Sequence, residues 1–181
     1  MGSPGELNPA DAYRRHAGRV LSYLRARGAA EPEDVLGEVF VQVARDARRF
    51  RGHGPTDERR WIFTIARNRL IDATRAAARR PVEPRENDDL RATPAPPPPE
   101  PIDPALISAL EALTDEQREV VVLRFVADLS LNDVAAVTGR KANAVKQLQH
   151  RALAALRRRL DPIDGDDELD LPVTPGDRTA L

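Results

Sequence analysis

The 181-residue chain contains no cysteine, and only 4% of its residues are aromatic. The lack of cysteine excludes disulfides, zinc sites built on thiolates and thiol-based redox sensing. No apolar run approaches the roughly 20 residues that a membrane-spanning helix needs, and the amino-terminal segment lacks the apolar core of a signal peptide. We therefore expect a soluble, cytoplasmic protein without membrane insertion.

Charge is strongly segregated along the chain although the net charge is only −1. Residues 1–80 carry a net charge of +6 and residues 104–160 carry +3, whereas residues 81–103 carry −4 and residues 161–181 carry −6. Basic segments favour a polyanionic partner such as nucleic acid. The alternative is that the arginines only make the exposed helix faces compatible with water.

Proline marks a boundary between two candidate domains. Nine of the 16 prolines lie between Pro81 and Pro104, where they exclude a continuous helix and favour an extended path. With no convincing strand elsewhere, we predict an all-α protein of two small helical domains joined by a proline-rich acidic linker. The predicted segments are a first domain, the linker, a second domain and an acidic disordered tail, over residues 1–80, 81–104, 105–160 and 161–181.

Three helices are expected in the first domain. The Asn8-Pro9 pair is a helix start signal, and Gly28 ends that helix. A second helix begins near Pro32 and carries an apolar stripe at helical spacing.

A loop over residues 51–57 is expected next, because its glycines and proline interrupt the helical pattern. A third helix should then run from about Asp57 to Arg79. Its predicted buried face consists of Trp61, Ile62, Ile65, Ala66, Leu70 and Ala73, which makes Trp61 a core residue rather than a stacking platform. Its predicted outer face consists of Arg60, Arg67, Asn68, Arg75 and Arg79.

The second domain has the spacing of a helix-turn-helix. Thr114 with Gln117 is a capping-box signal for a preceding helix. Counting from Leu131, a small Ala135 is fifth, Gly139 is ninth at the left-handed turn and Val145 is fifteenth, where it fills the space between the two helices.

The second helix of this unit is expected over residues 142–158, with Val145, Leu148, Ala152 and Leu156 facing the core. Its opposite face is suited to a DNA major groove, because cations meet phosphates while amides and guanidiniums read base edges. An ordinary amphipathic helix is the alternative. The candidate DNA-binding residues are Arg140, Lys141, Asn143, Lys146, Gln147, His150 and Arg151.

Two stretches resemble one known family. Residues 109–160 are similar to the promoter-binding fourth domain of an extracytoplasmic-function (ECF) sigma factor of the sigma-70 family. Residues 10–80 resemble that family's second domain, through EDVLGEVFVQVARDARRF (33–50) and ERRWIFTIARNRLID (58–72). The resemblance implies a factor that binds core RNA polymerase and directs promoter-specific initiation.

The resemblance also implies roles for individual residues. The helix-turn-helix face would read the −35 element, and loop 51–57 would receive a base flipped from the non-template strand. The −10 element would be read and melted by His53, Arg60, Arg67, Asn68, Arg75, Arg79 and Arg80. The polymerase clamp helices would be bound by Asp34, Glu38, Gln42, Arg45 and Arg49. Gly37 stands where the family usually has glutamine, which removes one polar contact. An anti-sigma factor is a further partner that the family implies.

Other classes remain open on the residues alone. A stand-alone helix-turn-helix regulator with a sensing or dimerising first domain is the main alternative, and a helical adaptor that binds no DNA is another. No catalytic set, metal-ligand cluster or phosphate-binding glycine loop is recognisable, so we expect neither an enzyme nor a bound cofactor or metal.

Overall fold

The computed structural model describes residues 7–79 and 103–160, and these residues form helices without any strand. The first part contains α1 (Pro9–Ala26), α2 (Pro32–Asp46), a short 3-10 turn η1 (Ala47–Arg49) and α3 (Gly54–Arg79). The second contains α4 (Pro104–Glu111), α5 (Asp115–Phe125), α6 (Leu131–Thr138) and α7 (Ala142–Leu160). We call these parts, residues 7–79 and 103–160, the first and second modules. The predicted all-α fold class is confirmed.

Local signals in the sequence place most helix ends. The Asn8 side chain caps α1 by accepting hydrogen bonds from two backbone N–H groups, and Gly28 beyond its end has a φ of +76°. Thr114 and Gln117 form the predicted capping box at α5. These ends form where predicted because each depends only on neighbours in sequence.

Two predicted boundaries are corrected by the structure. Helix α3 begins at Gly54 rather than near Asp57. Pro55 fits there because the first turn of a helix needs no proline N–H. The predicted linker ends too late, since Pro104 already belongs to α4 and Asp103 caps that helix. The rest of the linker, Arg80 and the predicted tail lie outside the described residues.

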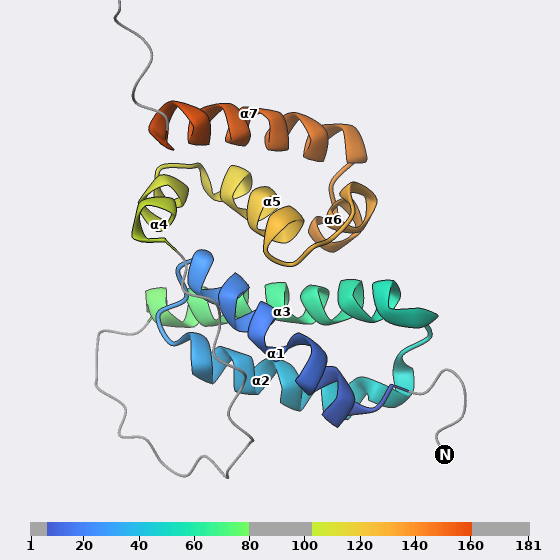
Figure 1. Cartoon of the computed structure of the whole chain (residues 1–181). Helices are drawn as coiled ribbons and strands as arrows, with labels where there is room; N and C mark the ends of the chain where they lie inside the picture. Colours follow the sequence, from blue (N-terminus) through green and yellow to red (C-terminus); the bar gives the residue numbers. More distant parts are fainter. Residues whose placement is uncertain (1–6, 80–102, 161–181) are drawn as a thin grey trace, which may run out of the picture.

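The modules form two layers that meet along α3 (Figure 1). Helices α1 and α2 pack on one side of α3, whereas α6 packs on its other side and α5 approaches α1. The buried apolar side chains of both modules belong to one continuous cluster, which includes Val20, Val39 and Ile62 from the first and Leu123 and Val145 from the second. Helix α3 is therefore shared between the layers.

A polar cluster around the buried Glu58 and His16 fixes α1 to the start of α3. The Arg15 guanidinium donates to both Glu58 carboxylate oxygens at 2.9 Å, and His16 Nε2 lies 2.9 Å from Glu58 Oε1. Burial lowers the pKa of His16, against an opposing effect of the Glu58 hydrogen bond. The carboxylate thus has partners for its charge despite its burial.

Gly139 has the left-handed conformation that the helix-turn-helix spacing predicts, with a φ of +68°. No atom lies within 4 Å of an added Cβ, so a substitution would be opposed by backbone strain alone. We expect Gly139→Ala to lower the free energy of unfolding by about 1–2 kcal/mol, measured by urea denaturation. Gly139→Asn should cost less, because asparagine tolerates this conformation. Equal stabilities of all three proteins would contradict a strained turn.

Candidate nucleic-acid interface

The outward face of α7 carries the residues predicted to meet DNA. Val145, Ala152 and Leu156 are buried and Leu148 is half-buried, which orients the helix as expected. Arg140 is half-buried and donates to Glu116 at 2.8 Å, so it also joins the turn to α5. The exposed members of this face are Lys141, Asn143, Lys146, Gln147, His150 and Arg151. Together they form a polar, cationic strip suited to a DNA groove.

The outer face of α2 is a second exposed surface. Asp34, Glu38 and Arg45 are exposed, as is Arg49 in η1 just after the helix. Gln42 is half-buried, and its Oε1 accepts from Arg69 Nη2 at 2.6 Å, which ties it to α3. Gln42 is therefore less available to a partner than the other four residues predicted for this face. The structure adds Val41 to this face, 50% exposed between these charges. Its apolar exposure has no signal in the sequence, since valine recurs along the buried stripe of the same helix.

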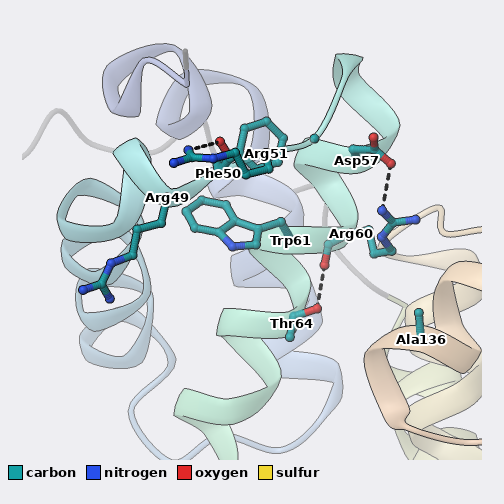
Figure 2. Close-up of a pocket in the computed structure, with 9 residues that line it drawn as sticks. Arg49, Phe50, Arg51, Asp57, Arg60, Trp61, Thr64 and Ala136 are labelled. Atoms are coloured by element: carbon teal, nitrogen blue, oxygen red, sulfur yellow. Dashed lines mark hydrogen bonds and ion pairs between the residues drawn. The ribbon is translucent and has the colours of Figure 1, made fainter. Parts of the chain in front are cut away.

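A pocket of about 400 Å³ opens where η1, the following loop and α3 meet (Figure 2). Phe50 and Trp61 stand together in it, with ring centroids 5.4 Å apart at 49°. Trp61 packs against the core cluster as predicted, but it is only half-buried because it also lines this pocket. The lining consists of Arg49, Phe50, Arg51, Gly52, Asp57, Arg60, Trp61, Thr64 and Ala136.

The pocket wall depends on Gly52 and Asp57. A Cβ on Gly52 would come within 2.5 Å of the Phe50 ring and 2.6 Å of Asp57 Cβ, so the loop accepts no side chain there without moving. Asp57 accepts the His53 backbone N–H at 2.8 Å and the Arg60 guanidinium at 2.8 Å. The exposed His53 side chain is not among the lining residues. Sequence reasoning located this loop but missed Phe50, Gly52 and Thr64.

Arg60 and Arg67 do not lie on a free outer face, which corrects the prediction for α3. Arg60 donates to Asp133 at 3.1 Å, and Arg67 donates to Glu119 at 2.8 Å, so both are held by the second module. The reason is that α3 is packed on two sides, and carboxylates of α5 and α6 compensate its guanidiniums. Asn68, Arg75 and Arg79 are exposed as predicted.

Tyr23 lies beside the contact between Arg67 and Glu119, fully buried and edge-to-face with Phe63 at 5.5 Å. Burial raises the pKa of Tyr23 to about 12, although Arg27 and Arg67 oppose the shift. Its hydroxyl therefore stays neutral and adds no charge between the layers at ordinary pH.

The described residues give no support to metal binding or to a membrane-spanning helix. Among them, no group of three or more histidine, aspartate or glutamate side chains is placed to hold a metal ion. No helix in residues 7–79 or 103–160 is long and apolar enough to cross a membrane.

Comparison with known proteins agrees with this arrangement. Family models for sigma-70 region 2 and sigma-70 region 4 match residues 12–80 and 109–158. The chain is 34% identical over 156 residues to the ECF RNA polymerase sigma factor BldN of Streptomyces coelicolor, covering 82% of this chain but 58% of BldN. It is 33% identical over 160 residues to the RNA polymerase sigma factor CarQ of Myxococcus xanthus, covering 85% of this chain and 90% of CarQ.

A solved structure matches both modules together. The structure of CnrH in complex with the cytosolic domain of CnrY aligns with a TM-score of 0.60 at 25% identity, over 86% of this chain and 89% of that chain. The match includes the all-helical, two-part architecture. The chain thus belongs to the extracytoplasmic-function sigma factors of the sigma-70 family and directs promoter-specific transcription.

Proposed function

We propose that the two modules divide the work of promoter recognition between the exposed α7 strip and the pocket at the start of α3. The α7 strip would read the −35 element as duplex DNA. The α3 pocket, with Asn68, Arg75 and Arg79 along the same helix, would hold the non-template strand of the −10 element and help to melt it. The supporting observation is that one chain carries both a helix-turn-helix strip and an aromatic pocket bordered by arginines.

The pocket has the chemistry that an unstacked base needs. The half-buried Trp61 offers a stacking partner, with the buried Phe50 ring packed beside it, and the neighbouring guanidiniums offer positive charge for the strand that carries the base. Gly52 lets the backbone approach without a side chain in the way. A duplex would open here because stacking and charge on one strand offset the lost base pairing.

The outer face of α2 is the proposed binding site for the clamp helices of core RNA polymerase. Its exposed residues of both signs surround the exposed Val41, a combination that suits a protein partner better than it suits DNA. Residues 1–80 and 105–160 would then act as the family's second and fourth domains.

An anti-sigma factor is also a proposed partner, because a sigma factor with a similar fold, RpoE, was solved in complex with the anti-sigma factor NepR from Bartonella quintana.

Reconstituted transcription tests the proposal. Core polymerase with the full chain should yield transcripts that share one pair of upstream elements, whereas the chain without core should not open promoter DNA. A stand-alone regulator would instead bind duplex promoter DNA tightly by itself and leave core polymerase inactive on these promoters. Failure to bind core polymerase at all would refute the proposal.

A further inference from the structure

Helix α7 carries cations without any acid. Its sequence, ANAVKQLQHRALAALRRRL, contains lysine, arginine and a run of three arginines near its end, but no aspartate or glutamate. We call Arg157, Arg158 and Arg159 the α7 end cluster. All three are exposed, as are Lys146 and Arg151 of the α7 strip. The helix therefore presents positive charge that its own residues do not neutralise.

The neighbouring helices supply no partner for these cations either. Within the two described modules, no carboxylate forms an ion pair with Lys146, Arg151 or the α7 end cluster. Helix α1 shows the opposite pattern, since its four arginines all pair with carboxylates, as Arg25 does with Glu33 at 2.6 Å. The positive charge of α7 is thus compensated by neither module.

The α7 end cluster continues the α7 strip along the same face of the helix. Arg157 follows His150 by seven residues, and Arg158 follows Arg151 by seven, which is close to two helical turns. A recognition helix contacts base edges through its first residues. At a rise of 1.5 Å per residue, Arg157 lies about 21 Å beyond Asn143. The α7 end cluster therefore lies beyond the part of the helix that is suited to read bases.

The chain continues from α7 directly into an acidic segment, residues 161–181, which lies outside the described residues. Its net charge is −6, and residues 164–170, DGDDELD, contain five acids. An extended chain advances about 3.3 Å per residue, whereas a helix rises about 1.5 Å. Asp167 can therefore return about 23 Å along α7, which is far enough to reach Lys146. Opposite charges on one chain are within reach of each other.

We propose that the acidic segment docks on the α7 strip and the α7 end cluster, where it competes with promoter DNA. This inference rests on the proposed function of the α7 strip. Carboxylate and phosphate oxygens are alternative partners for the same cation, so one excludes the other. Because the acids are tethered to Leu160, their effective concentration is high and weak pairs suffice. A competitor for one shared site lowers the affinity for every duplex by the same factor.

Neutralising the acids tests the inference in the full chain. The tail variant carries Asp164→Asn, Asp166→Asn, Asp167→Asn, Glu168→Gln and Asp170→Asn. The linker control removes the same charge from the segment between the modules and carries Glu83→Gln, Glu86→Gln, Asp88→Asn, Asp89→Asn and Glu100→Gln. All these positions lie outside the helices of the described modules, so both proteins should unfold at the same temperature as the unmodified chain.

Affinity for −35 duplex DNA across a salt series is the first measurement. At low salt we expect the tail variant to bind about 10-fold more tightly than the unmodified chain, as a tethered competitor of modest strength requires. An unrelated duplex should gain by the same factor. Both gains should shrink as salt rises, because screening weakens the contacts of the acidic segment as well.

The linker control should stay within about 2-fold of the unmodified chain, since its charges act only through the screened field of the protein. An equal gain in the tail variant and the linker control would mean that net charge governs the affinity. That result, or no gain in the tail variant, would overturn the inference.

Alanine at both Arg157 and Arg158 distinguishes the acidic segment from DNA as the ligand of the α7 end cluster. If the cluster holds the acidic segment, this change removes two positive charges and yet raises the affinity for −35 duplex DNA by about 3-fold. The same change made in the tail variant should bring no gain. A fall in affinity in both backgrounds would show that the cluster binds DNA phosphates instead, and would contradict docking there.

Proximity is measured without DNA. Because the chain has no cysteine, Thr174→Cys gives one site for a paramagnetic label in the acidic segment. The label should attenuate amide signals around Lys146, and about 1 M salt or neutralisation of the acids should relieve this attenuation. Amides of α2 serve as the reference. Attenuation around Lys146 that neither change relieves would mean that the tether alone brings the segment there.

Comparison of two duplexes separates this inference from the function beneath it. If the unmodified chain prefers the −35 duplex to an unrelated one, but neither affinity nor attenuation changes in the tail variant, docking is wrong and the proposed function stands. If no protein prefers the −35 duplex, the proposed function of the α7 strip fails, whatever the label shows of the acidic segment.

Discussion

Alanine at both Lys146 and Arg151 should weaken binding of −35 duplex DNA by about 10- to 100-fold at low salt. Both side chains are exposed on the α7 strip, so their loss removes DNA contacts without removing any core packing. If each cation neutralises one phosphate, the slope of log affinity against log salt should fall in magnitude by about 1.8. Fluorescence anisotropy across a salt series measures affinity and slope together.

The matched control for that double change is alanine at Arg45 and Arg48. These exposed residues on α2 and η1 carry the same charge but lie in the first module. Their loss should leave the slope of log affinity against log salt unchanged within experimental error when the protein is free of core polymerase. An equal fall in both variants would mean that the whole-chain charge, rather than the α7 strip, governs binding.

Trp61→Ala should reduce opening of the −10 region by about 5- to 150-fold, the effect of losing one stacking partner for a base. The half-buried Trp61 forms the pocket with Phe50, and truncation would leave the flipped base without that face. Permanganate reactivity of unpaired thymines, in complexes with core polymerase, reports the opening directly. Binding to core polymerase should be unchanged, because Trp61 is not part of the outer face of α2.

Trp61→Phe is the matched variant, because it keeps an aromatic face at the same site. It should retain most of the opening activity, and thermal unfolding of both variants separates loss of stacking from loss of stability. Wild-type opening by a folded Trp61→Ala protein would show that the pocket does not hold a base.

Much of this fold was predictable because its signals are local. Asn8, the capping box at Thr114 and the turn at Gly139 each act on backbone groups within a few residues. The orientation of α7 followed from apolar spacing, since a helix has one buried face whenever it packs on one neighbour. The −35 candidates were therefore almost all found exposed.

The α3 predictions were less accurate because α3 packs against both layers. Arg60 and Arg67 fall on the polar side of its sequence pattern, yet their partners are 73 and 52 residues further along the chain. Periodicity shows which face is polar, but it carries no information about what covers that face. Periodicity likewise placed Trp61 against the core, where it packs, but could not show that the same ring lines a pocket.

The continuous apolar cluster has a consequence for how the chain unfolds. With α3 packed between two layers, heating the protein should melt both modules in one cooperative transition, because losing either layer exposes part of the other's core. If the modules are separated, each is stabilised only by its own smaller core. Calorimetry would then show two overlapping transitions in place of one, so the number of melting steps becomes a measure of how tightly the two halves are coupled.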